Sequence, residues 1–123
     1  MRMLVVDDDR ELARFYRALL EDQGHEVVTA ASGAEALQRL AADPDVVLLD
    51  LMMPGIDGYE VLSRIRRSPR HEDVPVVVLS AAVSPLRGAI AGADGFVRKP
   101  FAFDHLLNAI DSATHARSLH HPR

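Results

Sequence analysis

The sequence predicts a doubly wound α/β fold, in which a five-stranded parallel sheet carries helices on both faces. Short apolar runs rich in valine and leucine recur five times, at residues 3–6, 26–29, 46–49, 76–79 and 95–98. The stretches between them show the spacing of amphipathic helices, and such alternation of strand and helix is typical of parallel sheets. The first, third and fourth runs are apolar at consecutive positions, as expected for strands covered on both faces.

The size and composition indicate a single soluble domain. The chain has 123 residues, a formal net charge of −4 and no cysteine. A chain of this length buries about two-thirds of its unfolded surface, so it folds without disulfides or structural zinc. Charges of both signs are spread along the chain, which argues against a nucleic-acid surface, and no apolar run approaches the roughly 20 residues that span a bilayer. We therefore expect a cytoplasmic protein with no direct contact to nucleic acid or membrane.

Start and stop signals predict the first three helices. The first follows the first strand and ends near Gly24, a residue suited to a left-handed cap. Ser32 with Glu35 forms a capping box that opens the second helix, and Asp57 with Glu60 opens the third. The apolar residues that place the first helix at helical spacing are Leu12, Phe15, Tyr16, Leu19 and Leu20.

The last two helices differ in strength. The fourth has room for only about two turns between Ser84 and Gly92, so we expect it to be short. The fifth is expected over residues 103 to about 113. We assign residues 1–114 to the domain and interpret residues 115–123 as a frayed tail or the start of a linker.

Residues able to do chemistry follow the predicted strands. In an open parallel sheet the functional crevice lies at the carboxyl ends of the strands, so these side chains should converge there. Three or more carboxylates, a hydroxyl and an ammonium would form a site for a hard cation beside a site for an anion. The residues are Asp7, Asp8 and Asp9 after the first strand, Asp50 after the third, Ser80 after the fourth and Lys99 after the fifth.

This set favours phosphoryl transfer with magnesium. Crowded carboxylates repel one another unless a divalent cation lies among them. Mg²⁺ prefers such oxygen ligands, at about 2.0 to 2.1 Å, and often shares them with a phosphoryl group. A carboxylate could then attack phosphorus to give an acyl phosphate, while Lys99 and Ser80 hold the phosphoryl oxygens.

Four segments resemble the receiver domain of two-component response regulators. They are residues 4–9 (LVVDDD), 48–58 (LLDLMMPGIDG), 78–81 (VLSA) and 99–101 (KPF). The similarity extends from residue 2 to about residue 113, and four motifs in this order at strand ends are specific. The resemblance implies the flavodoxin-like strand order 2-1-3-4-5.

The resemblance also implies roles around the phosphorylation site. Asp50 matches the phosphoacceptor, and Asp7 and Asp8 match the acidic pair that holds Mg²⁺ together with Asp50. Met52 would supply a backbone carbonyl as a further metal ligand. Lys99 matches the lysine that contacts the phosphoryl group, and its bond to the following proline would be cis.

A switch is implied by two further matches. Ser80 corresponds to the hydroxyl that turns toward the phosphoryl group, and Phe96 stands at the position of the switch aromatic residue. Only fifteen residues separate Ser80 from Phe96, about three fewer than the family usually has. This shortens the fourth helix and puts in question the usual output face, which the fourth helix, fifth strand and fifth helix form.

The resemblance implies a signalling switch rather than a metabolic enzyme. A histidine kinase or phosphotransfer protein would donate a phosphoryl group to Asp50, and the domain would catalyse part of its own phosphorylation and dephosphorylation. The partners would be that donor and a downstream effector, with a homodimer on phosphorylation as a further option.

Two other functions stay open from the residues alone. The shortened fourth helix also fits a constitutive binding module that works without phosphorylation. A phosphohydrolase of the haloacid dehalogenase type would use a strand-end aspartate too, but it needs a second aspartate where this chain has Met52. Individually, Asp8 or Asp9 could cap a helix, Lys99 could be a solvated lysine, and Phe96 could be core packing.

Overall fold

The computed structural model describes residues 1–81 and 92–120. The expected short fourth helix between Ser84 and Gly92 falls almost entirely outside these residues. The element labelled α4 is therefore the helix that the sequence predicts as the fifth.

All five predicted strands are present and form one parallel sheet. Its order is β2-β1-β3-β4-β5, which confirms the predicted fold class. The register sets Asp50 beside Leu79 and Ser80 beside Arg98, so the carboxyl ends of the central strands are level. The strands are β1 (Arg2–Val6), β2 (Glu26–Ala30), β3 (Val46–Asp50), β4 (Val76–Ser80) and β5 (Gly95–Arg98).

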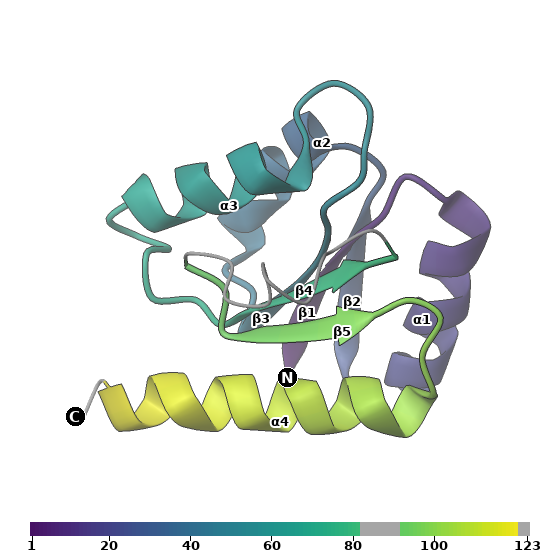
Figure 1. The fold of residues 1–123 in the computed structure, drawn as a ribbon. Helices are drawn as coiled ribbons and strands as arrows, with labels where there is room; N and C mark the ends of the chain where they lie inside the picture. The colour runs from purple at the N-terminus through teal and green to yellow at the C-terminus, as the bar shows by residue number, and fades with distance from the viewer. Residues whose placement is uncertain (82–91, 121–123) are drawn as a thin grey trace.

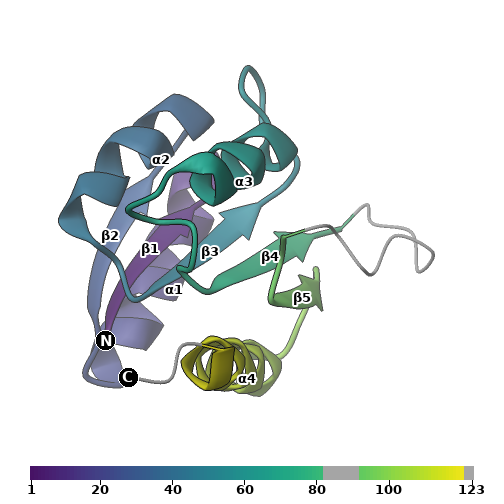
Figure 2. The ribbon, with the colours of Figure 1, turned by 90° about the vertical axis from the view of Figure 1, so that its left-hand side faces the viewer.

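Helices cover both faces of the sheet (Figure 1). Helices α2 and α3 lie on one face and helices α1 and α4 on the other, and a second view shows the same layers (Figure 2). Each of the first three helices begins after a side chain that accepts a backbone N–H. Ser32 and Asp57 do so as their capping patterns predict, and Asp9 is one of the two aspartates for which capping was left open. The helices are α1 (Arg10–Asp22), α2 (Gly33–Arg39), α3 (Gly58–Arg67) and α4 (Phe103–His120), with a short 3-10 turn, η1 (Leu40–Ala42), after α2.

The sheet separates two hydrophobic cores. Alternate residues of β1, β3 and β4 point into one core with α2 and α3, and the others into a second core with α1 and α4. Because residues 46–50 and 76–80 are buried at every position, strands β3 and β4 are covered on both sides. Burial of valine and leucine side chains, at about 1.5 to 3 kcal/mol each, fixes these strands at the centre of the fold.

Helix α4 is longer than the sequence predicts. It continues past residue 113 to His120, where a frayed tail was expected. Ala113 is fully buried, and Arg117 donates to the Asp94 carboxylate at 2.6 Å. Asp94 lies just before β5, so a contact distant in sequence stabilises turns that local periodicity does not mark. Where the domain ends stays a prediction.

Candidate phosphorylation site

The ends of four strands bring the predicted site residues to one edge of the sheet. Asp7 follows β1, and its N–H donates to the Ala30 carbonyl of β2 at 3.0 Å. Asp50 and Ser80 are the last residues of β3 and β4 rather than the first residues after them. Lys99 follows β5, and its N–H donates to the Ser80 carbonyl at 3.0 Å. These backbone bonds fix the positions from which the side chains project.

Three carboxylates gather at this edge. One carboxylate oxygen from each of Asp7, Asp8 and Asp50 lies within 4.8 Å of the other two. Asp7 and Asp50 are only 1% and 5% exposed, whereas Asp8 is exposed to solvent. The donor set consists of hard oxygen atoms with one open side, which fits a hydrated Mg²⁺ ion.

Each buried carboxylate is held by one backbone N–H. The N–H of Asp9 donates to Asp7 Oδ1 at 2.9 Å, and the N–H of Met52 donates to Asp50 Oδ1 at 3.1 Å. Both bonds join residues two apart, which is the geometry of an Asx turn. The bonds orient the two side chains so that each directs its Oδ2 atom at Lys99.

The Lys99 ammonium lies between the two buried carboxylates. Its Nζ is 2.8 Å from Asp7 Oδ2 and 3.5 Å from Asp50 Oδ2. Burial by itself would lower the pKa of Lys99, but the hydrogen bond and charge of Asp7, followed by the charge of Asp50, outweigh burial and raise it. The lysine is therefore a fixed cation. Its peptide bond to Pro100 is cis, as the resemblance implies.

The Asp50 carboxylate is costly to ionise in this surrounding. Burial raises its pKa, the Met52 N–H and the Lys99 charge lower it, and the Asp7 charge raises it again, with a net rise. One ammonium thus lies beside two buried carboxylates, and Asp8 adds a third carboxylate to the cluster. A divalent cation would remove the imbalance and favour the ionised form of Asp50.

Asp9 caps helix α1 and is not one of the three aspartates of the acidic cluster. Its side chain accepts from the Leu12 N–H at 3.1 Å and opens helix α1. Of the two aspartates that local pattern allows as caps, Asp9 fills this role and Asp8 lies with the cluster.

The structure places the remaining predicted residues without testing their roles. Ser80 is fully buried at the end of β4. Phe96 is half-buried opposite Val78 and packs on the core beneath α2 and α3. The Met52 side chain is exposed, while its backbone N–H holds Asp50. The switch roles of Ser80 and Phe96, and a metal bond from the Met52 carbonyl, stay predictions.

Gly58 supports the site in a way that sequence reasoning did not identify. A Cβ atom at this residue would overlap the carbonyl oxygen of Asp50 and the Cα of Leu51. The Gly58 N–H also donates to the Leu51 carbonyl at 3.1 Å. The first turn of α3 therefore packs directly on the backbone of Asp50, and only glycine allows this approach.

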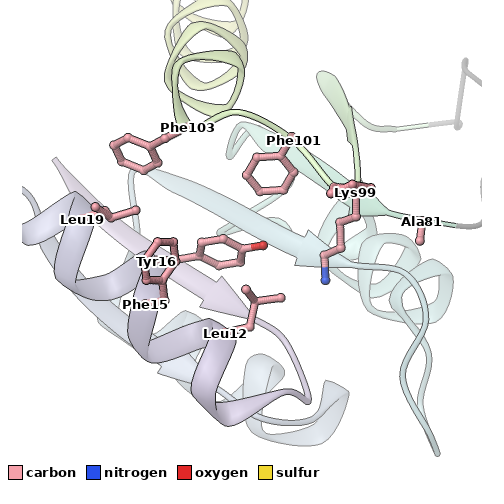
Figure 3. A pocket seen from close by; sticks show the side chains of 9 residues that line it. Leu12, Phe15, Tyr16, Leu19, Ala81, Lys99, Phe101 and Phe103 are labelled. Atoms are coloured by element: carbon pink, nitrogen blue, oxygen red, sulfur yellow. The ribbon is translucent and has the colours of Figure 1, made fainter.

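An aromatic cavity adjoins the site on the α1 side. It has a volume of about 480 Å³ and lies between α1, the segment after β5 and the start of α4 (Figure 3). Phe15 is exposed beside it, and the buried Tyr16 forms part of its wall. Lys99 also lines this cavity. The only sequence signal for Tyr16 was its place on the apolar face of α1.

Comparison with known proteins decides the family. The family model described as the response regulator receiver domain matches residues 3–111. The chain belongs to this receiver family. The match covers most of the chain, including all the strand-end residues described above.

Relatives and solved structures agree with this assignment. The receiver domain is 44% identical over 111 residues to the response regulator MprA of Mycobacterium avium (strain 104), an alignment that covers 87% of this chain and 48% of that protein. The chain thus spans about half the length of the curated relatives it matches. The chemotaxis response regulator CheY4 of Vibrio cholerae superposes with a TM-score of 0.84 at 33% identity, covering 91% and 97% of the two chains.

A second structure supports the same fold. The N-terminal domain of a response regulator receiver protein from Methanoculleus marisnigri JR1 superposes with a TM-score of 0.75 at 38% identity, covering 89% and 93% of the chains. Within the described part of the receiver domain, no helix is both long and apolar enough to cross a membrane.

Proposed function

We propose that this receiver domain is a phosphorylation-controlled switch in which Asp50 accepts a phosphoryl group from a histidine kinase or phosphotransfer protein. Asp7, Asp8, Asp50 and the Met52 carbonyl would hold Mg²⁺. The observation that carries the proposal is the meeting of three carboxylates within 4.8 Å, beside an ammonium 3.5 Å from Asp50 Oδ2. The expected cytoplasmic location of this exchange stays a prediction.

The two oxygens of Asp50 have different tasks in this proposal. The Met52 N–H occupies Oδ1, which leaves Oδ2 as the nucleophile on the side of Lys99. Oδ2 attacks phosphorus while the bond from phosphorus to the donor's histidine nitrogen breaks, and the electron pair leaves with that nitrogen. When bound, Mg²⁺ neutralises the oxygens of the transferring group. Lys99 adds a second positive charge beside Asp50, which phosphoryl transfer needs more than it needs acid or base catalysis.

Phosphorylation would then alter the contacts of Lys99 and Ser80. The ammonium now binds Asp7 more closely than Asp50, so a phosphoryl group on Asp50 offers it stronger acceptor oxygens. We propose that Ser80 turns toward the phosphoryl group and that Phe96 repacks beside Ser80. These changes would shift the equilibrium between two conformations of the domain. The altered surface around β5 and α4 would bind a downstream effector or a second copy of the domain.

The deciding experiment is phosphorylation by a small phosphodonor such as acetyl phosphate, followed by intact-mass measurement with and without Mg²⁺. Wild-type protein should gain one phosphoryl group only with Mg²⁺. Asp50→Asn should gain none, and the matched variant Asp9→Asn should behave like wild type, because asparagine also caps a helix. An acid-stable phosphoryl group on Asp50→Asn would contradict the assignment of the acceptor.

The same samples distinguish the other functions. Size measurement of both forms tests for a dimer on phosphorylation. A wild-type protein that takes up no phosphoryl group and shows no Mg²⁺ binding dependent on Asp8 would favour the constitutive binding module. Turnover of a generic phosphate ester would favour the phosphohydrolase.

A further inference from the structure

Tyr16 is a polar-tipped residue at a position that packing alone would fill with leucine or phenylalanine. It lies in the middle of α1, is 5% exposed and belongs to the core that α1 shares with α4. Its ring stacks on Phe101, with a centroid distance of 5.6 Å and an interplanar angle of 23°. Phe101 is two residues after Lys99, so this stack anchors the segment that carries the lysine.

The hydroxyl group of Tyr16 is directed toward Lys99. Figure 3 shows the phenol oxygen pointing across the cavity to the side on which the lysine extends, and both residues line that cavity. The other lining residues are apolar: Leu12, Phe15, Leu19, Ala81, Pro100, Phe101 and Phe103. Within the cavity wall, the phenol is therefore the polar side chain that faces the ammonium.

The Lys99 ammonium has capacity for another acceptor. It carries three N–H donors, and Asp7 and Asp50 are its acceptors in the described part of the chain. Burial raises the pKa of Tyr16. The charge of Lys99 lowers this pKa and the charge of Asp7 raises it, and the net effect is a rise. The phenol thus stays neutral at physiological pH and can offer an oxygen without adding charge to the acidic cluster.

We propose that Tyr16 is a positioning residue for Lys99. Its ring fixes the segment after the lysine, and its hydroxyl binds the ammonium through a water molecule in the cavity, which keeps Nζ between Asp7 and Asp50. Such a bridge is nearly as favourable as a direct hydrogen bond, and the cavity volume of about 480 Å³ leaves room for it. The inference rests on the proposed phosphorylation of Asp50.

Replacing Tyr16 by phenylalanine tests the hydroxyl alone, because the ring stack is retained. We expect Tyr16→Phe to keep the wild-type unfolding midpoint but to lower the maximal rate of phosphorylation by acetyl phosphate by about three- to tenfold. The donor concentration at half-maximal rate should not change, since the lysine acts on the transferring group. Tyr59→Phe is the matched control: Tyr59 is exposed on α3, and its variant should match wild type in both quantities.

A second background shows whether Tyr16 acts through Lys99. In Lys99→Ala protein, adding Tyr16→Phe should cause no further loss of rate, because the group that the hydroxyl positions is absent. Equal rates for Tyr16→Phe and wild type would overturn the inference, and so would an equal loss in both backgrounds. If wild-type protein is not phosphorylated at all, the proposed function fails instead, and the mass measurement separates that result from these.

Discussion

Removing the carboxylate of Asp94 should destabilise the domain far more than removing an ordinary surface charge. Asp94 accepts from Arg66 of α3 at 2.8 Å, from Arg117 of α4 at 2.6 Å and from the Val76 N–H of β4 at 2.9 Å. One side chain therefore joins both helical layers to the sheet. Asp94→Ala deletes all three interactions and leaves two guanidinium groups facing each other.

The magnitude follows from burial and from the number of bonds. The side chains of Arg66, Asp94 and Arg117 are 17%, 11% and 21% exposed, so solvent screens them only in part. Breaking a buried ion pair by removing one partner costs about 3 to 5 kcal/mol, and partial solvation reduces this to about 2 to 4 kcal/mol. Burial, followed by the charge of Arg117, lowers the pKa of Arg66, and Asp94 opposes both effects. Arg66 retains its bonds to the Gly92 and Val74 carbonyls, which limits the loss.

Urea unfolding followed by circular dichroism at neutral pH measures this free energy. The control is Glu21→Ala, which breaks an exposed ion pair between Arg17 and Glu21 on α1 and should cost about 0.3 to 0.5 kcal/mol. Asp94→Ala should also speed amide hydrogen exchange in the last turns of α4. If Asp94→Ala costs no more than Glu21→Ala, the reasoning that this carboxylate stabilises the end of α4 is wrong.

Three other measurements test the site. Mg²⁺ at about 100 times its dissociation constant should stabilise the domain by about 2.7 kcal/mol; an equal gain in Asp8→Ala would exclude that residue as a ligand. In metal-free buffer, the pKa of Asp50 in the folded protein is raised above its ordinary value of 3.8. The free energy of unfolding therefore falls as the pH rises from 3.8 through the pKa of the folded state. Asp50→Asn should remove this fall and gain about 0.5 to 2 kcal/mol at neutral pH, and an unchanged pH profile would refute it. Gly58→Ala should cost about 1 to 3 kcal/mol through overlap with the Asp50 backbone, whereas a gain in stability would show that α3 shifts freely.

The fold was predictable because its signals are local. The strands are short runs of valine and leucine, and the caps of α2 and α3 are formed by residues three apart. Convergence of Asp7, Asp50 and Lys99 followed from a general property of parallel sheets, that their carboxyl ends share one edge. The family resemblance added the strand order.

What the sequence did not reveal depends on distant contacts. The last turns of α4 are held by Arg117 and Asp94, which lie 23 residues apart. Helical spacing placed Phe15 with the apolar residues of α1, yet it lies exposed beside the cavity. The direction of the Tyr16 hydroxyl depends on the course of the segment around Phe101, which local periodicity does not specify.

The bond between Lys99 and Asp7 joins residues 92 positions apart in the chain. No fragment that lacks Asp7 or Lys99 can assemble this charge arrangement. Phosphorylation of Asp50 by acetyl phosphate should consequently be lost over the same range of urea concentration as the helical circular-dichroism signal. The extent of phosphorylation would then also report the fraction of folded protein. If Asp50 is the phosphoacceptor, a nascent or proteolytically shortened domain that lacks Asp7 or Lys99 would not be phosphorylated.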